Sequence, residues 1–434
     1  MLQTLTKRLL AVMMVFAASM TSSVMPARAS NPNLKYFGYV GIDAGIVDIQ
    51  SPKSGNCAPG DLTGCTYDDD VKTFSNLAHL SAGNGPSSPL FNVVSRLATT
   101  KTDGMGAIVD LQGLFWTPAS SCTPLSPAGG RKLTLRSDYS TVWSNFLTTN
   151  AAADVTAILA FYIADEPVWN GVSSSDLTTV ANLVHSSLPT IAILYVEAGS
   201  VVDGSHPTLY NSMVIPTAVT HVGFDKYGVL NPSTDTTYLT ALSNLKAKRT
   251  NSQAVLLIMD SSYLYSGEAD IGLQSTDIKT MDDNYLALAQ SDSSIIGMMG
   301  YAWPGGLGQA TPGVPIDCSP STTTTGTNSA GSSSLTVTSG TAFPTGSAIL
   351  IDTGANQETN IVTSGGGTTL TLSSPLQHTH SAGATVVLTN PPLCTYPYVS
   401  GHLPCSWLIY GMRDLPTSVI QENIVIGKSI TGKP

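Results

Sequence analysis

The sequence predicts an α/β fold, a (β/α)8 TIM barrel with a small all-β module inserted between its last strand and its last helix. Short apolar runs alternate with amphipathic segments, which is typical of parallel strands joined by helices. There are eight such runs, the strand number of this barrel. A stretch rich in Ser, Thr and Gly interrupts the pattern before a final amphipathic segment.

The first residues resemble a bacterial Sec-type signal peptide. Lys7 and Arg8 precede an apolar run from Leu9 to Ala18, and Ala27-Arg28-Ala29 has the small residues of a cleavage site. We therefore expect residues 1–29 to be removed and the mature chain to be secreted or periplasmic. The apolar run is too short to span a bilayer, and no later stretch reaches about 18 uninterrupted apolar residues, so we expect no membrane span.

The expected barrel strands lie within residues 30–318. The eight apolar runs are Tyr36 to Ile42, Thr73 to Leu80, Gly106 to Leu111, Ala157 to Ile163, Thr190 to Val196, His221 to Phe224, Ala254 to Met259 and Ile295 to Tyr301. Apolar residues three and four apart predict the helices between them, for example over Leu90 to Leu97 and Leu177 to Val184. Ser173 and Asp176 have the spacing of a capping box at the start of the second of these helices.

Residues 319–393 have a different character. A tract rich in Ser, Thr and Gly from Ser319 to Ser334 predicts a linker, and five short alternating runs after it predict a small β-module: Leu335 to Thr338, Ala348 to Asp352, Asn360 to Thr363, Thr369 to Leu372 and Thr385 to Leu388. Residues 394–434 return to the barrel, with Pro416 in the first turn of the eighth helix. Loops that follow barrel strands emerge at the active-site face, so we expect the module beside the barrel mouth, either gripping substrate or as an inert addition.

Composition limits the classes of partner. The net charge is −10, and removal of Lys7, Arg8 and Arg28 with the signal peptide lowers it to −13, which argues against nucleic acid. An even number of cysteines in an exported chain predicts disulfides, and spacing favours Cys57 with Cys65 and Cys318 with Cys394 while the overall pairing stays open. The six cysteines are Cys57, Cys65, Cys122, Cys318, Cys394 and Cys405.

The sequence predicts no metal site and no cofactor. Only His378 and His380 form a close histidine pair, and no third ligand accompanies them in the sequence. The patterns G-x-S-x-G and G-x-x-x-x-G-K-[ST] and the dinucleotide-binding fingerprint are missing, which argues against serine hydrolases and nucleotide enzymes.

The fourth strand ends in two adjacent carboxylates. Asp165 and Glu166, followed by Pro167, repel each other, and this repulsion raises one pKa. A raised pKa lets a general acid keep its proton near neutral pH. The alternative is a helix cap at Asp165 and a solvated rim residue at Glu166.

Asp165-Glu166-Pro167 resembles the Asn-Glu-Pro acid/base motif of the large glycoside hydrolase clan built on (β/α)8 barrels. The resemblance implies that Glu166 is the acid/base and that Asp165 replaces the Asn that binds a sugar hydroxyl. Gly223-Phe224-Asp225-Lys226-Tyr227 is similar to the strand-6 pattern of these barrels, and Tyr301-Ala302-Trp303 resembles the aromatic end of strand 8 that forms the sugar platform. The likeness covers about residues 35–310 and 405–426.

The seventh strand departs from the clan, which places a nucleophilic Glu there. This chain has Asp260, which is one methylene shorter, so we expect it to lie farther from Glu166 than the roughly 5–5.5 Å of a retaining enzyme. We therefore expect Asp260 to favour inversion through a water, at a carboxyl separation of roughly 6.5–9.5 Å. Glu197 and Asp225 are alternative partners, and the absence of any partner is a further one.

Aromatic and polar side chains gather at the expected mouth of the barrel. Trp116, Trp169 and Trp303 follow strands 3, 4 and 8, where their rings can stack on sugar faces. Loop packing is the alternative for each of these residues. The expected substrate-binding residues are Asp43, Asp165, Asp225, Tyr227, Glu197, Trp116, Trp169, Trp303 and Tyr263, and Gln112 can line the same cleft.

We therefore expect a secreted glycoside hydrolase that cleaves an extracellular poly- or oligosaccharide by a two-carboxylate mechanism. Glu166 protonates the leaving oxygen, and Asp260 acts as nucleophile or as base for water, with no need for a metal or cofactor. The alternative is a catalytically silent barrel that binds carbohydrate or serves surface adhesion, motivated by the missing strand-7 Glu.

Overall fold

The computed structural model describes residues 31–42, 67–118, 133–264, 272–303, 306–307, 321–390 and 408–434, without positions 89, 342, 344, 346–347 and 353–355. In this part of the chain, parallel strands close into a barrel in the order β1-β11-β9-β8-β7-β6-β3-β2. The fold is therefore the predicted (β/α)8 barrel, and each of the eight predicted strands is confirmed. They are β1 (Tyr36–Tyr39), β2 (Leu77–Ser81), β3 (Gly106–Asp110), β6 (Ile158–Asp165), β7 (Ala192–Ala198), β8 (His221–Asp225), β9 (Ala254–Asp260) and β11 (Ile295–Tyr301).

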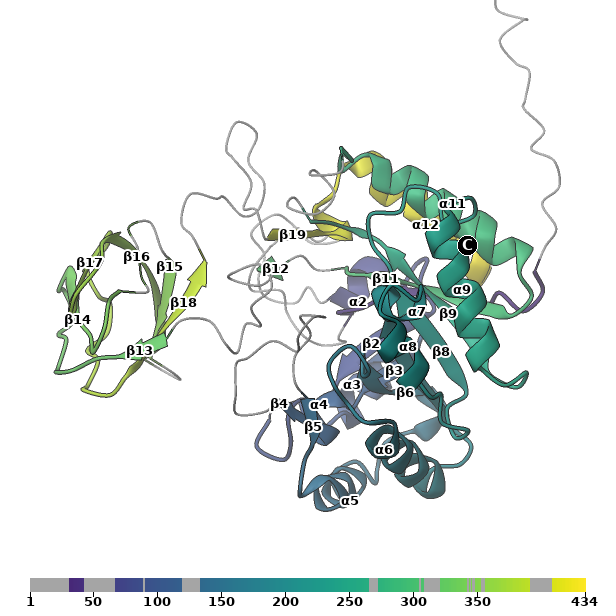
Figure 1. The fold of residues 1–434 in the computed structure, drawn as a ribbon, viewed down its shortest axis with the longest axis horizontal. Coiled ribbons are helices and arrows are strands. Elements are labelled where there is room, and N and C mark those ends of the chain that lie inside the picture. Colours follow the sequence, from purple (N-terminus) through teal and green to yellow (C-terminus); the bar gives the residue numbers. More distant parts are fainter. Residues whose placement is uncertain are drawn as a thin grey trace, which may run out of the picture.

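Helices cover the outside of the barrel (Figure 1). The longer ones are α3 (Val94–Thr102), α5 (Tyr139–Thr149), α6 (Ser174–Ser187), α9 (Thr236–Lys248), α11 (Asp277–Ser291) and α12 (Thr417–Thr431). Short helices α2 (Tyr67–Val71), α4 (Gln112–Phe115), α7 (Gly199–Val202) and α8 (Pro207–Ser212) lie in the connections, as does a hairpin of β4 (Trp116–Pro118) and β5 (Leu133–Leu135). None of the described helices is long and apolar enough to cross a membrane.

Local hydrogen bonds fix where several elements start. The capping prediction is confirmed, because Ser173 Oγ accepts the N–H of Asp176 at 3.1 Å in front of α6. The second strand is predicted from Thr73 but starts at Leu77. The N–H groups of Phe74 and Ser75 donate to the carbonyl of Val71 and so turn the chain at the end of α2.

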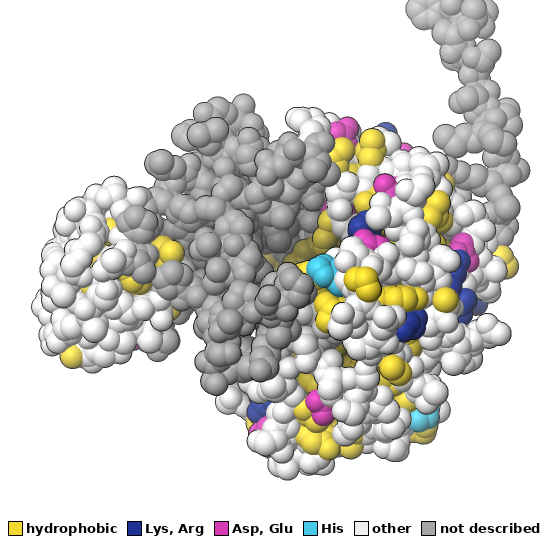
Figure 2. All heavy atoms as spheres, in the orientation of Figure 1, with side chains coloured by type: hydrophobic (Ala, Val, Ile, Leu, Met, Phe, Trp, Pro, Cys, Tyr) yellow, Lys and Arg dark blue, Asp and Glu magenta, His cyan; other side chains and the backbone are white. Residues whose placement is uncertain are grey.

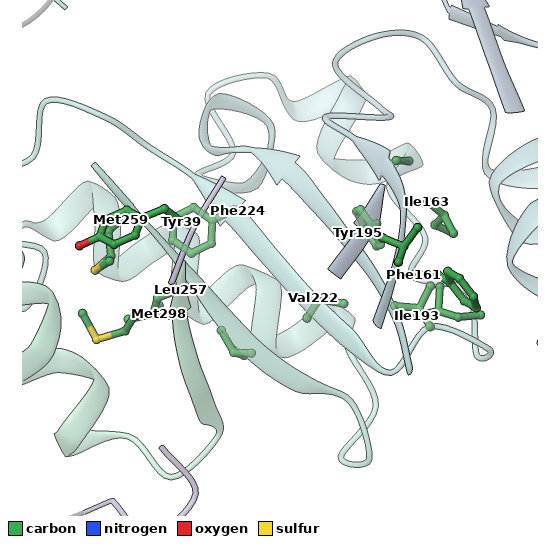
Figure 3. Packing of buried hydrophobic residues seen from close by; sticks show 14 of the residues in the cluster. Tyr39, Phe161, Ile163, Ile193, Tyr195, Val222, Phe224, Leu257, Met259 and Met298 are labelled. Carbon is green, nitrogen blue, oxygen red and sulfur yellow. The ribbon is translucent and has the colours of Figure 1, made fainter. Parts of the chain in front are cut away.

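The barrel has two cores, because successive strand residues point to opposite faces of the sheet. One set points outward beneath the helices and includes Phe161, Ile163, Tyr195 and Phe224, which Figure 3 shows. The other set fills the interior and consists of Leu77, Ile108, Ala160, Tyr162, Leu194, Val196, Leu256, Ile258 and Met299. Beyond this inner layer, side chains at the carboxyl ends of the strands surround a cavity.

The β-module has a sheet and a core of its own. Its strands are β13 (Ser321–Thr323), β14 (Ser334–Thr336), β15 (Ala348–Ile351), β16 (Glu358–Ser364), β17 (Thr369–Leu372) and β18 (Thr385–Asn390), in the order β13-β18-β15-β16-β17-β14. Leu335, Phe343, Ile349, Val362 and Leu370 are among its core residues. Its described surface is mostly uncharged (Figure 2), and residues 321–390 contain no Lys or Arg.

The Ser/Thr/Gly-rich tract is a correction to the sequence prediction. Its described part is not a linker, because β13 lies inside it and pairs with β18. Thr324 and Asn328 also form bridges, to Val337 and His380. The four consecutive threonines from Thr322 to Thr325 carried a strand signal here that the Gly and Ser content obscured.

The strand before the module and the strand after it pair with each other. β12 (Gly306–Leu307) follows β11 and pairs antiparallel with β19 (Leu408–Gly411), which precedes α12. β19 also pairs with β10 (Ser262–Leu264), which follows β9. The module is therefore inserted between strand 8 and helix 8, as predicted. The signal peptide and the six cysteines lie outside the described residues.

Candidate active site

A cavity of about 390 Å³ opens at the carboxyl ends of the barrel strands. This is the end at which (β/α)8 enzymes build their active sites, and the volume lies within the range of small-molecule sites. Its lining residues come from most of the strands: Val40, His79, Asp110, Gln112, Tyr162, Asp165, Glu166, Val196, Asp225, Tyr227, Ile258, Met299 and Tyr301.

Two adjacent carboxyl side chains share this cavity, which a regular strand would not allow, because neighbouring residues point to opposite faces. The pairing of β6 with β7 shifts register between Tyr162 and Ala164. Bulges of this kind re-aim side chains beside active sites. Glu166 then takes a φ of +46°, and its N–H donates to the carbonyl of Val196 at 2.7 Å. As a result, both Asp165 and Glu166 line the cavity.

Glu166 holds its proton more firmly than an ordinary glutamate. Burial, then the charge of Asp165, then that of Glu197 raise its pKa to about 8. Hydrogen bonds with the side chains of Asp225 and Asn170 act in the opposite direction without cancelling the rise. Glu166 is therefore protonated at neutral pH, the state that a general acid requires.

Asp225 at the tip of β8 lies beside Glu166 in the lining of the cavity, because only β7 separates β8 from β6. Their carboxyl groups are close enough to share a hydrogen bond, and Asp225 also accepts one from the Tyr227 hydroxyl at 3.3 Å. Burial, followed by the charges of Glu166 and Asp165, raises the pKa of Asp225 well above its usual value. Two carboxyl groups so close retain a proton between them.

Asp165 accepts a hydrogen bond from the Tyr162 hydroxyl. Its backbone N–H donates to Gln112 Oε1 at 3.1 Å, which ties the tip of β6 to the start of α4. Asp165, Asp225, Tyr227 and Gln112, each expected at the cleft, therefore all line the cavity with Glu166.

The cavity also contains side chains that the sequence reasoning missed. Asp110 ends β3, and burial raises its pKa to about 6 against hydrogen bonds from Gln112. His79 on β2 places its Nε2 3.9 Å from Asp110 Oδ2. Strand alternation could have found both: counting two residues on from inward-facing Leu77 and Ile108 reaches His79 and Asp110.

A pair of tyrosines forms the aromatic wall of the cavity. The rings of Tyr227 and Tyr301 lie 5.7 Å apart at an angle of 35°. Tyr301 ends β11 and faces inward, and burial followed by the charges of Asp165 and Asp225 raises its pKa to about 12. Both rings can offer an apolar face and a hydroxyl to a sugar.

Asp260, the expected second carboxylate, is buried at the tip of β9 and is not among the lining residues. Its Oδ2 accepts the N–H of Gly228 at 2.6 Å and so holds the loop that follows Tyr227. Glu197 is fully buried and also lies outside the lining. It has the outward parity of Tyr195, and its oxygens accept backbone N–H groups of the β6–α6 loop.

The tryptophans do not line the cavity either. Trp116 donates its Nε1 hydrogen to the carbonyl of Ile163. Trp303 packs on Tyr39 and Phe74 and donates to Asp70. The remaining two expected residues with a described position also pack elsewhere: Trp169 against the His206 ring, and Tyr263 with a hydroxyl bond to the carbonyl of Leu273. Asp43 lies outside the described residues. A position just after a strand does not determine which way a large ring turns.

Among the described residues, no group of three or more His, Cys, Asp or Glu side chains is arranged to hold a metal ion. His380 instead lies between two carboxylates of the β-module, 3.1 Å from Asp352 Oδ2 and 2.6 Å from Glu358 Oε1. What the cavity offers chemically is therefore a cluster of carboxyl groups with tyrosine hydroxyls and rings.

No protein-family model matches the sequence, and no curated protein matches it. Solved structures similar to this chain include three carbohydrate-active enzymes. A thermostable mutant of a xylanase from Cellvibrio japonicus shares 11% identity over 62% of this chain and 86% of its own, with a TM-score of 0.38. Native xylanase 10B from Thermotoga maritima shares 11% over 63% and 84%, with a TM-score of 0.38.

Bacteroides uniformis β-glucuronidase 3 shares 10% identity over 70% of this chain and 42% of its own, with a TM-score of 0.35. These likenesses are distant, and their TM-scores are too low to carry an argument about activity. The (β/α)8 assignment depends instead on the strand pairing of the chain itself.

Proposed function

We propose that this chain is a secreted glycoside hydrolase that cleaves a poly- or oligosaccharide, with Glu166 as its general acid. One observation carries the proposal. A half-buried glutamate whose pKa is raised to about 8 shares a hydrogen bond with Asp225 inside a cavity at the carboxyl ends of the barrel strands. Paired carboxyl groups with one retained proton are what glycosidic bond cleavage uses.

In the first step, Glu166 gives its proton to the glycosidic oxygen as the bond from that oxygen to the anomeric carbon breaks. Positive charge then develops on the sugar ring. The carboxylates of Asp165 and Asp225 lie beside the acid and stabilise this charge. The faces of Tyr227 and Tyr301 can hold the apolar face of the sugar, while their hydroxyls and Gln112 bind its hydroxyl groups.

We assign the second carboxylate to Asp225 rather than to Asp260. Asp225 lines the cavity and contacts Glu166, whereas Asp260 is engaged by the N–H of Gly228. A sugar that enters between Glu166 and Asp225 has to break their hydrogen bond. The two carboxyl groups need to move apart less to reach the separation of a retaining enzyme, roughly 5–5.5 Å, than that of an inverting one, roughly 6.5–9.5 Å. We therefore expect Asp225 to form a glycosyl ester that water then hydrolyses with Glu166 as base.

The test is a screen of polysaccharides with the wild type, Glu166→Gln and Glu422→Gln, following new reducing ends. Glu422 undergoes the same chemical change on α12, where it pairs with Lys279 at 2.8 Å away from the cavity. We expect Glu166→Gln to lose about 100- to 10,000-fold in turnover and Glu422→Gln to act like the wild type. Proton NMR of the first product should show the same anomeric configuration as the glycosidic bond of the substrate, because a retaining mechanism is expected.

Near-wild-type turnover by Glu166→Gln would show that Glu166 is not the general acid. If neither wild type nor variant releases sugar but both retain a glycan, the chain is the carbohydrate-binding barrel that the sequence left as the alternative. An inverted first product would point to a more distant carboxylate than Asp225.

A further inference from the structure

We propose that Glu197 is a positioning residue, which fixes the loop that carries the general acid and sets the charge around it. This inference rests on the proposed function of Glu166. It concerns a carboxylate that contacts neither the cavity nor a substrate within it, and therefore acts through Glu166.

The contacts of Glu197 are made with the chain that follows Glu166. Its Oε2 accepts the N–H of Val168 at 3.1 Å, and its Oε1 accepts the N–H of Trp169 at 3.3 Å. Oε1 also accepts the N–H of Ala198 at 3.0 Å. The side chain is fully buried, so water does not supply these N–H groups with another partner.

These bonds complete a clamp around the turn that starts at Glu166. From the preceding residue of β7, the carbonyl of Val196 accepts the N–H of Glu166 at 2.7 Å. Within the turn, the carbonyl of Glu166 accepts the N–H of Asn170 at 2.8 Å. Two successive residues of β7 therefore hold Glu166, whose φ is +46°, and the turn that follows it: Val196 bonds Glu166 itself, and Glu197 bonds Val168 and Trp169. Such a backbone persists only where its surroundings enforce it.

Glu197 also acts on Glu166 through charge. The groups that face Glu166 are Asp165 on β6, Glu197 on β7, Asp225 on β8 and Tyr301 on β11. After burial and the charge of Asp165, the charge of Glu197 contributes to the raised pKa of Glu166. Burial raises the pKa of Glu197 itself to about 8 against the three backbone hydrogen bonds that favour its carboxylate, so Glu197 and Glu166 ionise in the same pH range. There the charge of Glu197 opposes the release of the Glu166 proton, and its loss should lower the pH at which the acid gives up that proton.

Three variants separate position from charge. Glu197→Gln removes the charge and presents an NH2 group to one of the backbone N–H groups. Glu197→Asp keeps the charge but is too short to reach both Val168 and Trp169. Asp282→Asn is the matched control, since Asp282 is another fully buried acid whose pKa burial raises to about 8, but on α11 with Asn423 and Ser261 as partners.

In Glu197→Gln, we expect kcat to fall by about 100-fold through misplacement of the acid, with KM within about twofold of wild type. The alkaline limb of kcat/KM should move to lower pH by on the order of one unit. Glu197→Asp should lower kcat while leaving that limb near the wild-type position. Asp282→Asn should lower Tm and leave kcat and the limb unchanged.

The idea is overturned if Glu197→Gln keeps the wild-type kcat and alkaline limb, or if its activity falls only in proportion to its folded fraction. A raised KM at unchanged kcat also overturns it, because that result would make Glu197 a substrate contact. If the wild type hydrolyses no glycoside, the proposed function fails. A carbon-13 NMR titration of the Glu166 carboxyl then tests the inference without turnover: an unmoved titration in Glu197→Gln would rule out the effect of charge, and a carboxyl chemical shift unchanged in Glu197→Asp would rule out the effect on position.

Discussion

Glu166 has a backbone conformation that glutamate rarely adopts. A positive φ at a residue with a side chain costs about 1–3 kcal/mol and is found where the surrounding structure enforces it. Here the carbonyl of Val196 and the N–H of Asn170 hold the peptide groups of Glu166 in place. The strain places the carboxyl group beside Asp165 and Asp225, and the repulsion among these groups then keeps a proton in the site.

The raised pKa of Glu166 sets a pH limit on activity. The acid works only while protonated, so kcat/KM should be lost as the pH rises through about 8, the pKa of this group. Initial rates on a soluble substrate across neutral and alkaline pH give the profile. Circular dichroism at the same pH values shows whether the fold persists. Activity that stays flat through pH 8 in folded protein would exclude Glu166 as the acid.

For single residues, the sequence predicted the chemical role of Glu166 better than it predicted which side chains lie beside it. Adjacent carboxylates at a strand end indicated the acid, because their repulsion depends only on their being neighbours. Asp225 was one of three alternatives for its partner, and its contact with Glu166 depends on how the tips of β6 and β8 lie on either side of β7 in the closed barrel. His79 and Asp110 were missed although strand alternation places them inward.

At the scale of elements, the tip of β9 supports the loop after β8. Asp260 accepts the N–H of Gly228, whose φ of +72° suits glycine, and thereby holds the loop that carries Tyr227 into the cavity. A carboxylate at the end of a barrel strand can therefore serve the wall of a site without facing the substrate.

Matched substitutions at two strand tips distinguish these roles. In Asp260→Asn, an oxygen remains for the N–H of Gly228, so we expect turnover within about tenfold of wild type. Asp225→Asn removes the proposed nucleophile and should lose more than about 100-fold. Steady-state kinetics on one substrate compare the two. The reverse order of losses would return the second-carboxylate role to Asp260.

The strands were predictable because each is an apolar run buried on both faces, a signal contained in a few consecutive residues. The residues of the aromatic platform were not predictable in this way, because a ring that follows a strand can turn outward or inward. Trp303 turned into the packing around Tyr39 and Phe74, and the inward-facing Tyr301 took the place at the cavity.

At the scale of the whole molecule, the barrel and the β-module have separate hydrophobic cores. The module core, which includes Leu335, Ile351 and Val386, shares no residue with the barrel cores. At its edge the carboxylate of Glu358 accepts the N–H groups of Gln377 and His378 and contacts His380. We therefore expect each unit to fold by itself.

We expect residues 319–393, expressed alone, to fold and to lose stability in acid. Burial acts to raise the pKa of Glu358, but hydrogen bonds from Gln377, His380 and His378 outweigh it and lower the pKa below its ordinary 4.5. Its stabilisation is therefore complete above that pH and is lost as the pH falls further. Glu358→Gln should cost about 1–3 kcal/mol, and Gln357→Ala at the exposed neighbour little. Amide NMR dispersion and urea melts at several pH values check this; an unfolded fragment at neutral pH would contradict it.

The pairing of β12 with β19 allows the module to be exchanged as one unit. Leu307 and Leu408 are opposite partners in this ladder, so the inserted segment starts and ends at one place in the barrel. An insertion whose ends already meet adds little loop-closure entropy to the folding of its host. In evolution, a lineage could gain, replace or discard the module at this point while the barrel strands and the carboxyl cluster stay as they are.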